Sequence, residues 1–261
     1  MPVDSMSVDI GALAERLDTA ALNAEAIPQL ALEIELSEAD AYKIQAASIA
    51  RRLARGETRN GMKMGLTSRA KAIQMGVDDV VWGRLTDAMV IEEGGFASMA
   101  NFIHPRVEPE IAFLLKRNLA AGATALEAQR AIAAVAPAIE IIDSRYKDFK
   151  FSLGDTVADN TSAAGLVIGP WNENTGDIAN LGVGLSINGQ VCQIGTTAAI
   201  LGHPIRSLVA AADRSGTAGE ELQAGWIVMA GGATAAEALS IGDHVSVEVQ
   251  GLGHAGFTLQ E

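Results

Sequence analysis

The first quarter of the chain has the apolar spacing of amphipathic helices. Residues 9–24, DIGALAERLDTAALNA, place apolar side chains every three to four positions, and residues 36–56 do the same. The second segment starts with Ser37, followed three residues later by Asp40 in a pair that resembles a capping box, and it stops at Gly56. The spacing therefore predicts two N-terminal helices.

Beyond these helices the pattern favours strands separated by short helices. A short helix is predicted over 68–76, and a second over 124–137, where Thr124 and Glu127 form a capping box and Pro137 stops the helix. The predicted strands share runs of apolar and β-branched residues; they lie within 60–68, 87–95, 107–117, 138–146 and 163–171.

The last third is richest in strand and turn signals. Asn188-Gly189 sits between two apolar runs within residues 181–195, a strong hairpin signal. Residues 202–216 predict a helix, with Pro204 near its first position and Gly216 just past its end. The remaining segments read as short strands. We expect an α+β fold with a helical N-terminal portion at residues 1–75 and a strand-rich catalytic body at residues 76–261.

Composition narrows the classes of partner. The formal net charge is −13 and the isoelectric point is near 4.7, and no basic patch stands out. This argues against nucleic acid or an anionic membrane as a partner. The one cysteine, Cys192, excludes an intramolecular disulfide and fits a reducing compartment. The opening residues lack signal-peptide features, and no apolar run reaches the roughly 18 residues of a membrane helix. We expect a cytoplasmic protein.

Three glutamates stand in apolar strand segments. Glu108 and Glu110 lie two residues apart, so in a strand both carboxylates project from one face. Glu140 lies between Ile139 and Ile141 in another apolar run. Three such carboxylates supply the oxygen ligands of a hard divalent cation. The alternative is a solvated face of an edge strand. The four histidines are scattered, which disfavours zinc.

The stretch GMKMGLTS places Lys63 between two methionines. A lysine in apolar surroundings can move a proton or clamp a substrate, but it can also extend its ammonium group to the surface. Ser68 and Arg69 follow at the start of the predicted short helix, where a hydroxyl, a guanidinium and a helix N-terminus suit a carboxylate. Ser68 as an ordinary helix cap is the other interpretation.

Residues 152–165, SLGDTVADNTSAAG, gather short polar side chains that are typical of a loop. Within them Asn160 and Ser162 are candidates for binding a substrate. No G-x-S-x-G motif is present, and neither a serine nor a cysteine stands beside a histidine, so nucleophilic hydrolysis has little support.

Taken in order, seven segments resemble the fumarylacetoacetate hydrolase superfamily, in its branch of hydratases and decarboxylases: GMKMGLTS, GRLTDAM, HPRVEPEIAFLLKR, PAIEIIDSRY, DTVADNTSAAG, LGHP and AGGATAA. The resemblance covers nearly the whole chain and implies a mixed β-roll body. It implies that Glu108, Glu110 and Glu140 bind Mg²⁺ or Mn²⁺, that Lys63 is the active-site lysine, and that Asp87 is the active-site aspartate.

Within this branch the segments 67–89, 144–155 and 230–236 are most similar to 4-oxalocrotonate (2-oxo-3-hexenedioate) decarboxylases of meta-cleavage pathways. The resemblance implies a small 2-oxo dicarboxylate substrate. Arg69 and the Asn160/Ser162 loop are candidates for holding its distal carboxylate, and Lys150 is a weaker one; the alternative for Arg69 and Lys150 is a solvated charge on a helix or loop. A 2-hydroxypenta-2,4-dienoate hydratase is the second hypothesis. A non-catalytic scaffold for a partner enzyme is the third. The family also implies a homo-oligomer and association with the pathway hydratase.

Overall fold

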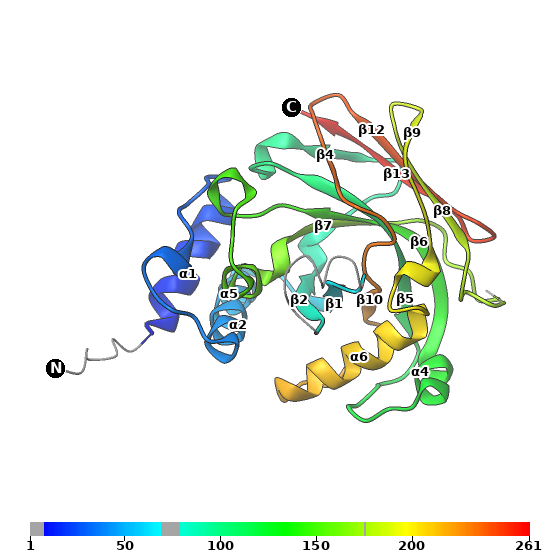
Figure 1. The fold of residues 1–261 in the computed structure, drawn as a ribbon, viewed down its shortest axis with the longest axis horizontal. Helices are drawn as coiled ribbons and strands as arrows, with labels where there is room; N and C mark the ends of the chain where they lie inside the picture. Colours follow the sequence, from blue (N-terminus) through cyan, green and yellow to red (C-terminus); the bar gives the residue numbers. More distant parts are fainter. Residues whose placement is uncertain (1–7, 69–78, 175) are drawn as a thin grey trace.

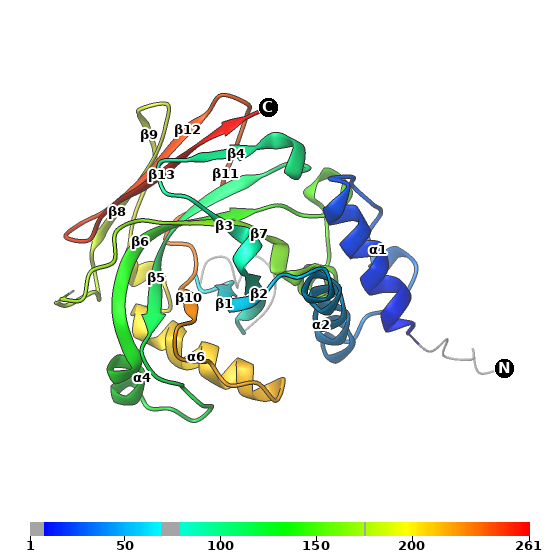
Figure 2. The same ribbon diagram turned by 180° about the vertical axis from the view of Figure 1, so that it is seen from behind.

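The computed structural model describes residues 8–68, 79–174 and 176–261. Helices α1 and α2 lie together at one end of a body of curved sheets, and α4 and α6 cover its other end (Figures 1 and 2). The helices are α1 (Ile10–Leu22), α2 (Glu38–Ala54), α4 (Ala125–Ala131), α5 (Leu153–Ala158) and α6 (Pro204–Thr217). Short 3-10 turns lie at Leu30–Leu32, Asp87–Met89, Met99–Asn101, Lys147–Phe149, Asn160–Ser162 and Thr197–Ala199.

The strands form two mixed sheets. They are β1 (Arg59–Gly65), β2 (Val81–Thr86), β3 (Val90–Ile91), β4 (Phe96–Ser98), β5 (Arg106–Leu115), β6 (Ile132–Ile142), β7 (Ala163–Ile168), β8 (Gly182–Ile187), β9 (Gln190–Thr196), β10 (Ile227–Met229), β11 (Glu237–Ala238), β12 (His244–Val249) and β13 (Gly253–Gln260). The larger sheet has the order β2-β1-β10-β5-β6-β7-β3 with β11 beside β5, and the smaller has the order β4-β13-β12-β8-β9. The expected α+β architecture is confirmed.

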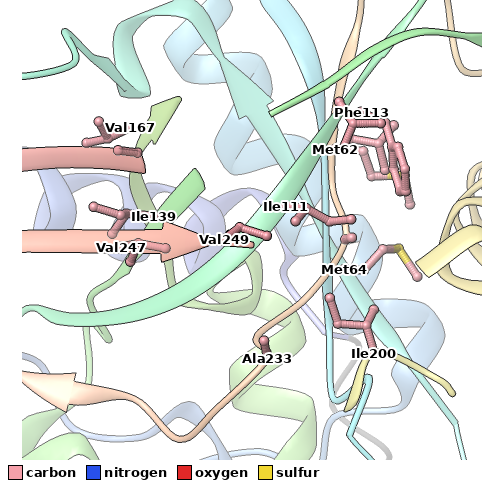
Figure 3. Close-up of a cluster of buried hydrophobic side chains, with 14 of the residues drawn as sticks. Met62, Met64, Ile111, Phe113, Ile139, Val167, Ile200, Ala233, Val247 and Val249 are labelled. Carbon is pink, nitrogen blue, oxygen red and sulfur yellow. The ribbon is translucent and has the colours of Figure 1, made fainter. Parts of the chain in front are cut away.

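The two long central strands, β5 and β6, divide their side chains between the core and the other face of the sheet. On β5, Val107, Ile111 and Phe113 enter the main hydrophobic cluster, as Ile139 and Ile141 do on β6. Side chains of the smaller sheet pack against this face, and Figure 3 shows some of them together. Because side chains alternate along a strand, the even-numbered residues of β5 and β6 face the other way. The core thus fixes which residues can meet on the opposite face.

The N-terminal helices have their own apolar cluster, in which Leu17 and Ile44 pack against Tyr146 and Val157 of the body. The cap predicted for α2 is confirmed, since the Ser37 side chain accepts a hydrogen bond from the Asp40 backbone. The division after residue 75 stays a prediction. Strand β1, which precedes that boundary, pairs with β2 and β10 of the larger sheet.

The helix predicted over 124–137 is wrong in its second half. The capping box at Thr124 is present, but α4 ends at Ala131 and strand β6 runs straight through Pro137. Proline is tolerated there because Ala138 pairs with Ile168, the last residue of β7, so Pro137 lies just beyond the end of that strand pair. The Pro137 carbonyl accepts from the Gly169 amide on this side. The amide that proline lacks would point to the same side, so the paired part of β6 and β7 loses no hydrogen-bond donor. Pairing with β5 overrides the local helical spacing.

Residues 152–165, predicted as a loop, contain helix α5. Ser152 and Asp155 form a reciprocal capping box that begins it. The Asn188-Gly189 hairpin is confirmed, with both residues at positive φ between β8 and β9. The short helix predicted over 68–76 lies largely outside the described residues. None of the described helices is both long and apolar enough for a membrane span.

A left-handed turn follows α5. Asn160, Thr161 and Ser162 have φ angles of 49°, 53° and 57°, a conformation that is unfavourable for residues with side chains. The Asn160 side chain binds both backbone groups of Arg84, accepting at 2.7 Å and donating at 2.8 Å. The Thr161 hydroxyl donates to the Trp82 carbonyl. These bonds to β2 hold the turn in place.

The fit between this turn and β2 requires a glycine, which leads to a prediction. A Cβ on Gly83 would lie 2.5 Å from the Asn160 carbonyl oxygen, whereas a Cβ on Gly184 in β8 would meet nothing within 4 Å. Gly83→Ala should lower the free energy of unfolding in urea by about 1–3 kcal/mol through overpacking. Gly184→Ala should leave it nearly unchanged. Equal losses in the two variants would contradict the proposed contact.

Candidate active site

The three predicted glutamates meet on the face of the large sheet that is opposite the core. Glu108 of β5 pairs directly with Glu140 of β6, and Glu110 follows two residues along β5. One carboxylate oxygen from each lies within 4.8 Å of the others. Glu110 and Glu140 are buried and Glu108 is partly buried. The interpretation as a solvated edge-strand face does not hold, because β5 and β6 are central strands.

Concentrating negative charge here is unfavourable without a cation. Burial, followed by repulsion from Glu140, raises the pKa of Glu110 well above its ordinary value of 4.5. Burial also raises the pKa of Glu140, although Lys63 opposes the shift. One oxygen of Glu110 accepts from the Gly231 amide at 2.8 Å. Its other oxygen, Oε1, is buried and has no hydrogen-bond partner among the described residues.

This donor set fits a divalent ion. Three carboxylates supply hard oxygen ligands at a spacing one ion can bridge, and the orphaned oxygen of Glu110 lacks only a cation. Three protein ligands leave coordination positions for water or substrate. Glu108, Glu110 and Glu140 are therefore the residues that would hold Mg²⁺ or Mn²⁺.

Lys63 lies beside the glutamates. On β1 its neighbours Met62 and Met64 turn into the core, so the Lys63 side chain takes the opposite face. Its Nζ atom is 2.9 Å from Glu140 Oε1, and both side chains are less than 5% exposed. This is a buried ion pair, not a lysine that extends to the surface.

A cavity of about 390 Å³ lies beside these groups. Its charged lining residues are Lys63, Arg106, Glu108 and Glu140. Its other lining side chains are mainly apolar or hydroxylic, and they include Leu66, Thr67, Val81, Ile142, Phe149, Phe151, Thr156, Thr161 and Ser162. A cavity of this size and composition suits a small organic acid.

Of the predicted substrate-binding residues, Ser162 lines the cavity. Asn160 does not, because its side-chain amide is bonded to the backbone of Arg84. Ser68 is half-buried and is also absent from the lining. Arg69 lies outside the described residues. Lys150 is exposed and does not line the cavity.

The structure does not bring Asp87 to this cavity. Its exposed carboxylate accepts hydrogen bonds from the Thr58 hydroxyl at 2.6 Å and the Thr58 amide at 2.9 Å, which lower its pKa. Lys63 pairs with Gly83, four residues before Asp87, or about 13 Å along the strand. A role for Asp87 at the site stays a prediction of the resemblance.

Sequence reasoning missed three residues that line the cavity, namely Arg106, Phe149 and Phe151. Arg106 precedes Glu108 by two residues, so the rule that paired Glu108 with Glu110 also places Arg106 on this face. Phe149 and Phe151 carried no such signal. Their position depends on a 3-10 turn in which Asp148 and Phe149 both have positive φ.

Divalent metal should stabilise the folded protein through these carboxylates. At about 100 times its dissociation constant, Mg²⁺ or Mn²⁺ should add about 2.7 kcal/mol, measured as a rise in Tm. The rise should shrink as the pH falls, because the raised pKa values of Glu110 and Glu140 let protons compete for the ligands.

Glu110→Gln should weaken metal affinity by at least about 100-fold, since even outer-shell partners contribute about 10- to 100-fold. The matched control is Glu248→Gln, an exposed strand glutamate on β12, which should keep the full rise in Tm. Loss of the effect in both variants would argue against this site.

Comparisons with known proteins identify the family of this chain. Residues 56–260 match the family model for the fumarylacetoacetate (FAA) hydrolase C-terminal region. A 4-oxalocrotonate decarboxylase of Pseudomonas sp. is 52% identical over 249 residues, covering 95% of this chain and 97% of that protein. A 2-hydroxyhexa-2,4-dienoate hydratase of Comamonas testosteroni is 34% identical, covering 87% of this chain and 88% of that protein.

The fold has a close counterpart among solved structures. The 4-oxalocrotonate decarboxylase from Pseudomonas putida G7, complexed with magnesium and adipate, superposes with a TM-score of 0.93 at 38% identity. The match covers 96% of this chain and 97% of that one, which confirms the expected fold type. By its sequence, fold and carboxylate triad, the chain belongs to the fumarylacetoacetate hydrolase family.

Proposed function

We propose that this protein is a divalent-metal-dependent carboxy-lyase that converts 4-oxalocrotonate to 2-hydroxypenta-2,4-dienoate in meta-cleavage degradation of aromatic compounds. The observation that carries the proposal is the triad of Glu108, Glu110 and Glu140, with Lys63 against Glu140 at one end of a cavity. Relatives named as 4-oxalocrotonate decarboxylases support it. So does the magnesium and adipate complex of one of them, because adipate is also a six-carbon dicarboxylate.

The reaction needs stabilisation of negative charge at one oxygen. Loss of CO₂ breaks the C5–C6 bond of the substrate, and the electron pair moves through the conjugated C3=C4 bond onto the 2-oxo oxygen. Groups that favour this charge lower the barrier, because the charge is larger in the transition state than in the ground state. A divalent ion held by the triad supplies Lewis-acid stabilisation at that end of the substrate.

We assign Lys63 as the general acid that donates the proton needed to complete the reaction. Its Nζ is held against Glu140 at the charged end of the cavity, where the 2-oxo group would lie. As charge develops on the 2-oxo oxygen, Lys63 donates a hydrogen bond and then a proton, which gives the enol product. The contact with the Glu140 carboxylate holds the Lys63 side chain in this buried position.

We infer that the uncharged part of the cavity limits the contact of water with a bound substrate. Val81, Ile142 and Phe151 supply apolar wall, and the left-handed turn presents Thr161 and Ser162. Low water content strengthens the interactions of Lys63 with the developing charge. It also disfavours addition of water to the diene, which is the reaction of the related hydratases.

We further propose a cytoplasmic homo-oligomer that associates with the hydratase acting on its product. Edge strand β9 supports a subunit contact, since Val191 and Ile194 are 63% and 81% exposed. A partner hydratase would receive the reactive dienol directly.

The function can be tested with metal-stripped protein. Addition of Mg²⁺ or Mn²⁺ should restore CO₂ release from 4-oxalocrotonate together with the loss of substrate absorbance, and Glu108→Gln should abolish both. Hydration of 2-hydroxypenta-2,4-dienoate with 4-oxalocrotonate left intact would assign the protein to the hydratases. Inactivity on both compounds, with metal bound, would favour the scaffold hypothesis.

Replacement of Lys63 tests its proposed role. Lys63→Met should lower kcat by about 10²- to 10⁴-fold, the range expected for loss of a general acid. Its metal-dependent rise in Tm should persist, because the three glutamates remain. Lys43→Met, an exposed lysine of α2, serves as the control and should keep full activity. A kcat close to that of the unmodified protein would remove Lys63 from the mechanism.

A further inference from the structure

Arg106 is the first residue of β5, the strand that also carries Glu108 and Glu110. Arg106, Glu108 and Glu110 occupy alternate positions, so their side chains leave the same face of the sheet. Arg106 lines the same cavity as Lys63 and Glu140. Its guanidinium carbon lies 4.3 Å above the ring centre of Phe149. A second cation therefore borders the cavity, beyond the glutamates.

The guanidinium of Arg106 keeps its donors for a ligand. Stacking engages the face of the guanidinium and leaves its N–H groups, which lie in the plane, able to bind a carboxylate. Within the described parts of the chain, no carboxylate or carbonyl accepts a hydrogen bond from the Arg106 side chain. In contrast, Arg84 is bonded to Glu220 and Gln45, and Arg145 is bonded to Asp159.

The ring under Arg106 is held in place. The Phe149 ring centre lies 5.2 Å from that of His104 and 5.3 Å from that of Phe151. Phe149 and Asp148 have φ angles of 55° and 59°, which the surrounding contacts must stabilise. The Phe149 ring under the guanidinium is therefore held between His104 and Phe151. A guanidinium that is already positioned loses less conformational entropy when it binds an anion.

Spacing and charge point to the distal carboxylate of the substrate. Two residues of strand separate Arg106 from Glu108 by about 7 Å. The carbon chain of an extended six-carbon diacid spans about 6 Å, from five C–C bonds of about 1.5 Å. An acid with its 2-oxo end at the triad would thus reach Arg106 with its other carboxylate. Glu108 and Glu140, which line the cavity, would repel that second charge unless a cation received it.

We propose that Arg106, stacked on Phe149, binds the carboxylate that leaves as CO₂ and so selects 2-oxo dicarboxylates over 2-oxo monocarboxylates. This inference rests on the proposed function. The leaving carboxylate loses its charge as CO₂ forms, so the ion pair with Arg106 is stronger in the ground state than in the transition state. Arg106 therefore contributes to substrate affinity and not to kcat.

The experiment uses two unreactive six-carbon acids as competitive inhibitors, 2-oxoadipate with two carboxylates and 2-oxohexanoate with one. The unmodified holoenzyme should bind 2-oxoadipate more tightly. Arg106→Gln should reduce this preference by about 10- to 100-fold, as expected for a lost charge-assisted hydrogen bond, with 2-oxohexanoate affinity unchanged. Arg106→Lys, which keeps the charge but loses the planar fork, should fall between them.

Lys43→Gln is the matched control, because it removes one exposed positive charge, on α2, that does not line the cavity. It should keep the preference of the unmodified protein. With 4-oxalocrotonate, Arg106→Gln should raise KM while kcat stays equal or rises. A full metal-dependent rise in Tm would show that the variant is folded.

Equal loss of affinity for both inhibitors in Arg106→Gln would overturn the assignment, since it would indicate a structural role. An unchanged preference in Arg106→Gln, with its loss in Arg69→Gln, would transfer the role to Arg69. The inhibitor comparison does not depend on turnover. If the unmodified protein prefers 2-oxoadipate through Arg106 but releases no CO₂, the proposed function fails and the binding site stands.

Discussion

Three carboxylates that lie within reach of one another, two of them buried, impose the strongest constraint on this molecule. Burial and repulsion oppose ionisation of Glu110 and Glu140, so charging these two groups destabilises the fold. Lys63 compensates part of the charge through its contact with Glu140. The proposed divalent cation would compensate more of it, and would meet the buried Oε1 of Glu110, which has no hydrogen-bond partner among the described residues.

The sheet can bear this cluster because one of its faces packs in the hydrophobic core and the other faces the cavity. On β5 and β6 one set of alternating side chains fills the main core, which stabilises the strands, while the other set bears the glutamates. A shift of one residue in the pairing would exchange the two sets and place carboxylates in the core. The apolar packing thus supports the charged site and also fixes its register. Arg106 obeys the same alternation, so one strand presents both metal ligands and the proposed carboxylate clamp.

The rest of the cavity is built from irregular backbone. The left-handed turn at Asn160–Ser162 is bonded to β2, and the turn before Phe151 places two aromatic rings in the wall of the cavity. Residues of the turn have different roles: the Asn160 side-chain amide stabilises the turn, and Ser162 borders the cavity. Strained backbone of this kind persists only where neighbouring contacts over-determine it.

Local patterns in the sequence were enough to predict the N-terminal helices, the Ser37 cap of the second helix, the Asn188-Gly189 hairpin and the shared face of Glu108 and Glu110, since each depends on spacing within a few residues. Glu140 and Lys63 were candidates because apolar residues flank each of them. Tertiary structure decided that residues after Ala131 form a strand, because pairing with β5 outweighs helical spacing. It also placed Asp87 against Thr58 and Phe149 beneath Arg106, since contacts between distant segments leave no periodic trace in the chain.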